Sequence, residues 1–274
     1  MKLGLFGHPV SHSRSPRLFA RLSRLLKRPI SYSAVKVYPG ELGSAVAAAR
    51  NAGWSGANVT IPLKEEAAAL ANSLTPQARA LGAVNVLRFG RTVIGHNTDG
   101  EGLRDALRRA GVTTRGRNAL VFGGGGAARA AGWALAKAGA RAVRFTARTA
   151  SRAKKAAQDL GTYFPRTRFS SGACAPAEIW VNATPLGMKG FPDRSPAPKF
   201  LPSPEAAVDL VYGRRAAFQR DAAARGARVV DGASMLVFQA LRAWECWDRP
   251  LGAVRRAKFA EPLLREVLIR EALE

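Results

Sequence analysis

Four consecutive glycines, Gly123–Gly126, separate an apolar segment from an alanine-rich one, and this junction constrains the fold most strongly. Residues 118–122 predict a buried strand, residues 127–138 a helix and residues 142–147 a second strand. A unit of about thirty residues is the expected size for one crossover between parallel strands. Glycines at such a junction let backbone N–H groups approach a pyrophosphate at the helix N-terminus. The junction therefore predicts a dinucleotide-binding unit.

The G-x-G-x-x-A motif that starts at Gly123 is weak by itself, and a purely structural turn is the alternative. The end of the second predicted strand indicates which cofactor would bind. An NAD site places an acidic residue there, but residues 147–152 read Ala-Arg-Thr-Ala-Ser-Arg and carry no carboxylate. The planar donor groups of Arg148 and Arg152 suit a 2′-phosphate, which favours NADP. The alternative is that both arginines are ordinary surface residues.

Strands alternate with helices along most of the chain, which predicts the α/β fold class with a largely parallel sheet. In the first hundred residues we expect strands at 2–6, 33–37 and 56–61, helices at 16–26, 41–52 and 64–71, and a hairpin of 83–89 with 92–95. Beyond them we expect a helix at 102–110 and strands at 179–182, 207–210 and 228–230. The last forty residues read as helical.

The chain is strongly basic, with 43 lysines and arginines against 19 acidic residues and a formal net charge of +24. Such a balance is compatible with nucleic-acid binding. Here the basic residues are scattered, and no basic arm, zinc module or RNA-binding aromatic motif accompanies them. A solvated, arginine-rich surface is therefore favoured over a nucleic-acid partner. A positive field would also attract small anionic substrates and phosphorylated cofactors.

Composition also bears on location and metals. Cys174 and Cys246 stand far apart and form no C-x-x-C pair, so we expect neither a disulfide framework nor a metal site. The first apolar segment is too short for a signal-peptide core, and charges interrupt every long apolar stretch. We therefore expect a soluble cytoplasmic protein without a membrane partner.

Four polar clusters in the first hundred residues are candidates for site chemistry. Hydroxyls before a predicted helix can hold a carboxylate, and polar residues at strand ends stand where open α/β sheets bind ligands. Each cluster has a simpler interpretation: helix capping by Ser13 or Ser15, a solvated helix start for Lys64, and turn chemistry for the other two. The clusters are residues 11–16, 58–64, 82–85 and 95–100.

Taken together and in this order, these clusters resemble the motifs of shikimate dehydrogenases over nearly the whole chain. The resemblance is more specific than any single cluster. The matching segments are 7–16 (an opening substrate motif), 58–64 (N-V-T-x-P-x-K), Asn85, 97–100 (N-T-D-G), 123–127 (the glycine loop), 182–188 (N-A-T-x-x-G-M) and 231–239 (a closing substrate segment).

The resemblance implies roles for individual residues. It implies that Ser13 and Ser15 hold a substrate carboxylate near Tyr212, and that Lys64 is the general acid–base beside Asp99. The residues implied to bind the ring hydroxyls are Thr60, Asn85, Asp99 and Gln239. The residues implied to bind NADP are Gly123, Gly124, Gly125, Gly126 and Ala127 in the glycine loop, Arg148, Thr149 and Arg152 at the 2′-phosphate, and Thr184, Met188, Leu210, Gly232 and Met235 at the nicotinamide half.

Three positions depart from the family pattern. Val86 stands where threonine is usual, and Ala147 replaces the usual asparagine. Residues 213–218, Gly-Arg-Arg-Ala-Ala-Phe, lack the common proline and Thr-Pro. The third departure leaves the course of that loop undetermined by the sequence, and none of the three affects Lys64 or Asp99.

The resemblance also implies two domains, with the site in a cleft between them. Residues 1–100 and 235–274 would form the substrate domain, of mixed and mostly parallel α/β structure, and residues 101–234 a Rossmann-like NADP-binding domain. The implied activity is reduction of 3-dehydroshikimate to shikimate, by a monomer or homodimer. One alternative is a same-fold enzyme acting on quinate or another polyol acid. The other is a nucleotide-binding sensor or nucleic-acid binder without catalysis, against which the intact Lys64 and Asp99 argue.

Overall fold

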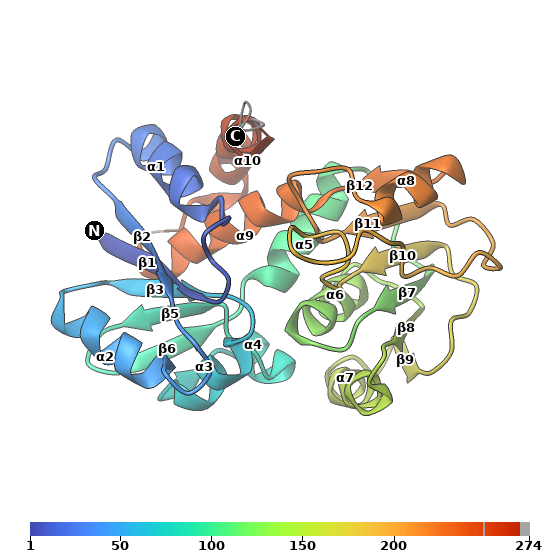
Figure 1. The fold of residues 1–274 in the computed structure, drawn as a ribbon, viewed down its shortest axis with the longest axis horizontal. Helices are drawn as coiled ribbons and strands as arrows, with labels where there is room; N and C mark the ends of the chain where they lie inside the picture. The colour runs from blue at the N-terminus through green and yellow to red at the C-terminus, as the bar shows by residue number, and fades with distance from the viewer. Residues whose placement is uncertain (249, 269–274) are drawn as a thin grey trace. The chain divides into compact units, whose positions relative to one another are not determined.

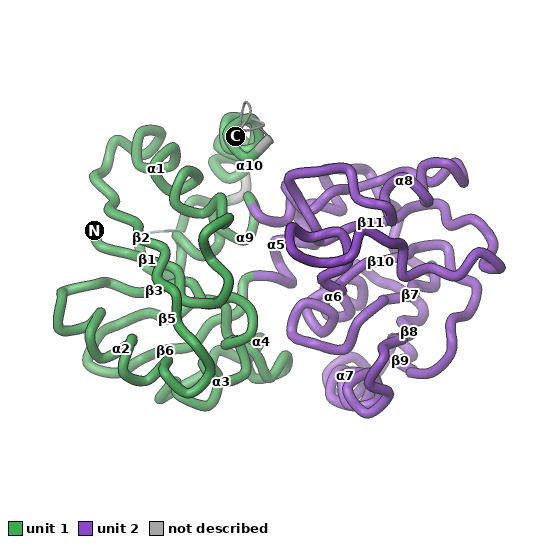
Figure 2. Tube along the Cα trace, viewed as in Figure 1, with its two compact units in different colours: residues 1–98, 237–274 green, residues 99–236 purple. Residues whose placement is uncertain are grey.

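The computed structural model describes residues 1–248 and 250–268. The chain forms two compact units, one built from residues 1–98 together with the described residues from 237 onward, and one from residues 99–236 (Figure 2). Each unit contains its own six-stranded sheet. None of the helices formed by these residues combines the length and the apolar character that a membrane span requires.

The first unit has a mixed sheet in which only β5 runs against its neighbours. Strand β1, the second in the sheet, pairs in parallel with β2 on one side and with β3 on the other. β5 is antiparallel to both β3 and β6, and β4 then adds in parallel to β6. The order across the sheet is β2 (Ser31–Lys36), β1 (Lys2–Gly7), β3 (Gly56–Val59), β5 (Val86–Phe89), β6 (Val93–His96) and β4 (Ser73–Leu74). The expected mixed, mostly parallel architecture is confirmed.

Helices α1 and α10 of the first unit lie side by side (Figure 1). α1 buries Leu18, Phe19 and Leu22 on one face, the spacing of an amphipathic helix. Arg14, just before α1, donates a hydrogen bond to the carbonyl of Val267 in α10 at 2.6 Å. The helices of this unit are α1 (Ser15–Leu26), α2 (Leu42–Asn51), α3 (Lys64–Leu70), α4 (Pro76–Leu81) and α10 (Gly252–Leu268), and α9 (Gly232–Trp247) leads the chain back into it.

One hydrophobic core cluster of the first unit lies between its sheet and α2 and α3. Phe6, Leu42 and Leu63 are fully buried there, and the ring of Phe6 stacks on Trp54 with centroids 5.8 Å apart. Full burial of one such side chain stabilises a fold by about 1.5–3 kcal/mol. Because Leu63 directly precedes α3, its burial fixes the start of that helix.

The second unit has a parallel sheet in the doubly wound order β12-β11-β10-β7-β8-β9. α6 (Gly126–Lys137) contacts β7 and β8, α7 (Ala150–Tyr163) contacts β8 and β9, and α8 (Ala217–Ala224) contacts β11 and β12 (Figure 1). α5 (Asp99–Arg109) packs on α6. The strands are β7 (Asn118–Phe122), β8 (Ala142–Thr146), β9 (Arg168–Ser171), β10 (Ile179–Asn182), β11 (Ala206–Asp209) and β12 (Arg228–Val230).

Strand order reverses between β7 and β10, so the carboxyl ends of these two strands face the crevice where such sheets bind ligands. Leu120, Trp180 and Phe218 form part of the core on the side covered by α8. Five elements were not predicted from the sequence: β4, α4, α7, β9 and α8. α5 also begins at Asp99, three residues before the expected start at Gly102.

Candidate active site

In the first unit the loops that follow β1 and β3 lie against each other. The N–H of His8 donates to the carbonyl of Ile61 at 2.9 Å, and that of Thr60 donates to Phe6 at 2.9 Å. A Cβ atom at Gly7 would lie 2.3 Å from Cγ2 of Thr60, so only glycine permits this approach. Two of the segments that carry the resemblance, 7–16 and 58–64, therefore meet at the carboxyl ends of parallel strands.

Ser13 and Ser15 stand where α1 begins, but neither is its N-cap residue. The N-cap is Arg14, which makes no side-chain capping hydrogen bond. The hydroxyl oxygen of Ser13 accepts from the N–H of Ser15 at 3.2 Å, and Ser15 is 8% exposed. A hydroxyl that accepts one hydrogen bond still has its own proton to donate. Neither serine is therefore the N-cap residue, although the Ser13 hydroxyl satisfies the first N–H of α1.

Lys64 is the first residue of α3, and its main chain is tied to the loop before β5. Its carbonyl accepts from the N–H of Val84 at 2.8 Å, and its side chain is half-buried. In the first turn of the same helix, the carboxylate of Glu66 accepts from the N–H of Gly40 at 3.1 Å and from that of Leu42 at 3.3 Å. The start of α3 is thus held on both sides.

A buried amide network lies next to this helix start. Asn85, which is 3% exposed, accepts the N–H of Thr98 at 2.8 Å and donates to the Thr98 hydroxyl oxygen at 3.0 Å. Its Nδ2 also lies 3.4 Å from the side-chain Oε1 of Gln239. The Thr98 hydroxyl donates to the main-chain carbonyl of Gln239 at 3.0 Å. The network joins three segments far apart in sequence, and it holds two residues, Asn85 and Gln239, that the resemblance assigned to substrate.

Asp99 directly follows Thr98 and is 5% exposed. It is the first residue of α5, where the helix dipole favours a negative charge.

Burial lowers the pKa of His96, and the charge of Arg88 lowers it further. The imidazole of His96 is consequently neutral at pH 7 and poorly suited to donate a proton.

The glycine loop of the second unit divides into two parts. A Cβ at Gly123, whose φ is +128°, would lie 2.9 Å from the carbonyl oxygen of Ala183, and one at Gly124 would lie 2.9 Å from the backbone of residues 152–153. These two glycines are required by the protein's own packing. A Cβ at Gly125, by contrast, would meet no protein atom within 4 Å. Space is therefore open beside Gly125 at the N-terminus of α6, as a site for a pyrophosphate requires.

Arg148, Thr149 and Arg152 gather where β8 turns into α7, and all three are exposed. Thr149 is the N-cap of α7 but makes no side-chain capping hydrogen bond. Neither arginine forms an ion pair with another described residue, so both guanidinium groups are available to an anion. The residue types and placement fit the 2′-phosphate of NADP.

The segments expected to flank the nicotinamide follow β10, β11 and β12. Gly232 approaches the chain so closely that a Cβ would lie 2.5 Å from the carbonyl oxygen of Leu210. Thr184 and Met188 lie in the loop after β10, and Tyr212 lies just past β11; all three are half-buried. Met235 is 9% exposed in the first turns of α9.

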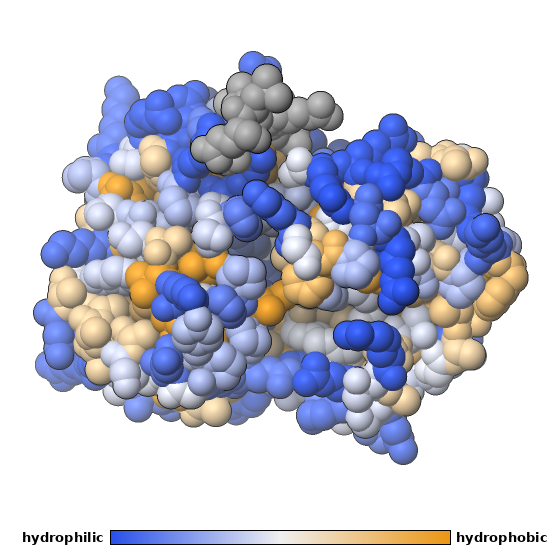
Figure 3. Space-filling model, viewed as in Figure 1, coloured by the Kyte–Doolittle hydropathy of each residue, from blue (hydrophilic) through white to orange (hydrophobic). Residues whose placement is uncertain are grey.

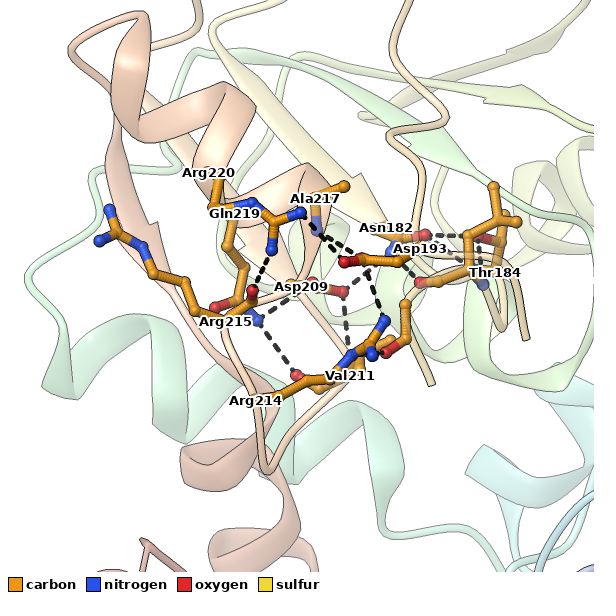
Figure 4. A network of polar contacts seen from close by, with 12 residues as sticks. Asn182, Thr184, Asp193, Asp209, Val211, Arg214, Arg215, Ala217, Gln219 and Arg220 are labelled. Atoms are coloured by element: carbon orange, nitrogen blue, oxygen red, sulfur yellow. Dashed lines mark hydrogen bonds and ion pairs between the residues drawn. The ribbon is translucent and has the colours of Figure 1, made fainter. Parts of the chain in front are cut away.

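A buried carboxylate holds two of these segments together (Figure 4). Asp209 has no exposed surface and accepts from Asn182 at 2.9 Å, from the N–H of Val211 at 3.1 Å and from Gln219 at 3.1 Å. Burial raises the pKa of Asp209 to about 6, despite the opposing effect of these hydrogen bonds. The same Asn182 accepts from the N–H of Thr184 at 3.0 Å and from its hydroxyl at 2.6 Å.

Sequence reasoning missed Thr98, Asp209 and Gln219. Thr98 lies inside the predicted N-T-D-G motif, and Asp209 immediately precedes Leu210, so both adjoin predicted site residues.

Cys174 and Cys246 are free thiols, and burial raises the pKa of Cys246 to about 12, which keeps it protonated. Within residues 1–248 and 250–268, no three His, Cys, Asp or Glu side chains cluster closely enough to hold a metal ion.

Comparisons with known proteins place this architecture among dehydrogenases. Residues 5–87 match the shikimate dehydrogenase substrate-binding domain. The shikimate dehydrogenase (NADP(+)) of Rubrobacter xylanophilus is 41% identical over 273 residues, which cover 94% of this chain and 95% of that protein. The corresponding enzyme of Symbiobacterium thermophilum is 37% identical over 274 residues, covering 94% and 93%.

Solved structures give the same result. The crystal structure of shikimate 5-dehydrogenase from Thermus thermophilus in complex with NADP(H) and shikimate has a TM-score of 0.84 and 34% identity, covering 97% of this chain and 99% of that one. A 5-ketofructose reductase of Gluconobacter has a TM-score of 0.80 and 27% identity, covering 96% and 98%. Identity of 41% across nearly the full length of both chains, together with the matching motifs, shows that this chain belongs to the shikimate dehydrogenase family.

Proposed function

We propose that this chain is an NADP-dependent oxidoreductase that reversibly reduces 3-dehydroshikimate to shikimate, a step of aromatic amino acid biosynthesis. The observation that carries the proposal is that Lys64, Asn85 and Thr98 lie at one edge of the first sheet, next to the ends of the neighbouring strands β3, β5 and β6. Asp99 directly follows Thr98 in the sequence. Relatives named shikimate dehydrogenase (NADP(+)) over 94% of the chain support the same reaction.

The substrate is anchored by polar side chains. Hydroxyls of Ser13 and Ser15 are directed at the carboxylate, with Tyr212 as a further donor. Thr60, Asn85, Asp99 and Gln239 bind the ring hydroxyls. Because Thr98 holds both ends of the Asn85 amide, that group meets the substrate already oriented and loses little entropy on binding.

NADPH, when bound, supplies a hydride to the ketone carbon. The glycine loop and the N-terminus of α6 hold the pyrophosphate, and Arg148, Thr149 and Arg152 hold the 2′-phosphate. Thr184, Met188, Leu210, Gly232 and Met235 line the nicotinamide end. The resulting alkoxide oxygen takes a proton from the Lys64 ammonium group, and Asp99 is the carboxylate assigned to work with that lysine. In the oxidation of shikimate the same proton returns to a neutral Lys64.

The experiment that tests the chemistry replaces Lys64 by alanine. Loss of a general acid–base lowers turnover by about 10² to 10⁴, so kcat for Lys64→Ala should fall by that factor while substrate affinity changes much less. Lys258→Ala is a matched control, because Lys258 is an exposed lysine on α10. Near-normal turnover by Lys64→Ala would show that another group transfers the proton.

A same-fold enzyme acting on quinate is the second candidate, and assaying quinate beside shikimate distinguishes the two. The Ser13-x-Ser15 pair favours shikimate.

We also propose that the protein acts in the cytoplasm on small molecules, as a monomer or homodimer and without nucleic acid. Hydrophilic residues are spread over the visible face of each unit (Figure 3).

A further inference from the structure

The loop after Tyr212 departs from the family pattern, and the structure shows what holds it. Asp193 lies in the loop after β10 and faces Arg214, in the loop after β11, and Arg220, in α8 (Figure 4). Its carboxylate lies 3.1 Å from Nη2 of Arg214 and 3.0 Å from Nη2 of Arg220. One acidic residue therefore joins the loop after β10 to the loop after β11 and to α8.

Arg214 connects the same two loops a second time. Its Nε donates to the carbonyl of Gly187 at 2.7 Å, so its planar donor group bridges the main chain of one loop and the carboxylate within that loop. Gly187 has a φ of +93°, and a Cβ there would lie 2.6 Å from Cβ of Ala216. The two loops thus touch with no room for a side chain at Gly187.

Asp193 also supplies the cap that α8 lacks in its own sequence. The N-cap residue Ala216 has no side chain able to accept a hydrogen bond. Oδ1 of Asp193 accepts from the N–H of Ala217 at 2.8 Å instead. This hydrogen bond, followed by the contacts with Arg220 and Arg214, lowers the pKa of Asp193, so the carboxylate is charged at neutral pH. Its charge also suits the N-terminus of a helix.

We propose that Asp193 and Arg214 form a positioning clamp, which fixes the loop carrying Tyr212 against the loop carrying Thr184 and Met188. The inference rests on the proposed function, because it takes these three residues as contacts of the substrate and the nicotinamide. Asp193 and Arg214 touch neither ligand in this account and act through the loops that they join. Asp209 and Asn182 join the same two loops through buried hydrogen bonds. The clamp joins these loops a second time, at the protein surface.

The clamp acts on one end of the cofactor only. Thr184, Met188 and Tyr212 follow β10 and β11, whereas Arg148 and Arg152 follow β8, on the opposite side of β7 in the sheet. Loosening the clamp should therefore misplace the nicotinamide end and leave the adenosine end bound as before. A general loss of folding would weaken both ends together.

The test compares Asp193→Ala, Arg214→Ala and the double variant with wild type, with Arg215→Ala as the matched control. Arg215 is an exposed neighbour on the same loop whose side chain takes no part in the clamp. The measurements are kcat and KM for shikimate oxidation, the Kd of adenosine 2′,5′-bisphosphate, and Tm. Asp193→Asn keeps an acceptor for the N–H of Ala217 and serves if Asp193→Ala does not fold.

Each clamp variant should lower kcat/KM about tenfold, because each removes contacts that hold the two loops in place. The double variant should lose less than the product of the two, since the residues act as a pair. The Kd of the bisphosphate and the activity of Arg215→Ala should stay within about twofold of wild type. Wild-type kcat/KM in both clamp variants, or a weakening of the bisphosphate that parallels the loss of activity, would overturn the clamp. Inactivity of the wild type towards shikimate would instead refute the proposed function, and the clamp with it.

Discussion

Replacing Asp209 by asparagine removes a buried charge with little change of shape, and its effect on stability should depend on pH. The side chain has no exposed surface, and the groups of Asn182, Val211 and Gln219 that donate to it are all neutral. The pKa of Asp209 is about 6, against an ordinary value of 3.8. The folded state therefore holds this proton more tightly than the unfolded state does. Its contribution to stability is fully present below the unfolded value and is lost as pH rises through the folded one.

The size of the effect follows from those two pKa values. Between pH 5 and pH 7 the free energy of unfolding of the wild type should fall by about 1 kcal/mol relative to Asp209→Asn, because asparagine does not titrate. Above pH 7 the difference between the two proteins should be constant. Gln219 can turn its amide to present its oxygen to the new Nδ2, so the substituted side chain keeps its hydrogen-bond partners.

Urea unfolding followed by tryptophan fluorescence measures this difference, since Trp180 is buried in the core of the same unit. Wild type and Asp209→Asn are compared at pH 5, 6 and 7 in one buffer series of fixed ionic strength. Only the change of their difference with pH is interpreted, so that all other titrating groups cancel. A difference that stays constant from pH 5 to pH 7, or that changes in the opposite direction, would refute the assignment of a proton to buried Asp209 near pH 6.

Three further predictions concern ligand binding. Replacing both Ser13 and Ser15 by alanine should raise KM for shikimate strongly and change KM for NADP much less; an unchanged KM for shikimate would leave these serines without a role in binding. Arg148→Ala should weaken NADP about ten- to a hundredfold, as expected when a hydrogen bond to a charged group is lost, with NAD nearly unaffected; equal weakening of both cofactors in steady-state kinetics would make the arginines mere surface charge. Gly125→Ala should leave Tm close to that of wild type, because its Cβ meets no protein atom, yet weaken NADP in a binding titration; unaltered NADP affinity would place the pyrophosphate elsewhere.

Much of the fold could be predicted because its strands are short apolar runs closed by glycine, proline or asparagine. The strands at 118–122, 179–182 and 228–230 were predicted to the residue. α7 was not, since it buries only Ala153, Ala156, Ala157 and Leu160, and alanines give little contrast with the polar face. β9 reads Arg-Phe-Ser-Ser at the sheet edge, and β4 has two residues. Neither segment is long enough to show an alternating pattern.

The site was predictable where its residues stand in short linear motifs, and not where they act across the sequence. Residues 58–64 and 97–100 are continuous, so the sequence alone shows their composition and spacing. Asp193 lies 27 positions from Arg220 and 24 from Ala217, and Asp209 lies 27 from Asn182. Only the folded sheet brings these groups together. The loop after Tyr212 was left open by the sequence because arginines, and not the usual prolines, shape it.

The measurement that tests the account most directly is the consumption of NADPH by the wild-type protein in the presence of 3-dehydroshikimate, with NADH assayed in parallel. The account predicts a loss of NADPH that requires 3-dehydroshikimate, yields shikimate in equal amount, and proceeds with a higher kcat/KM than the reaction with NADH. Consumption no faster than without substrate, or a preference for NADH, would contradict it.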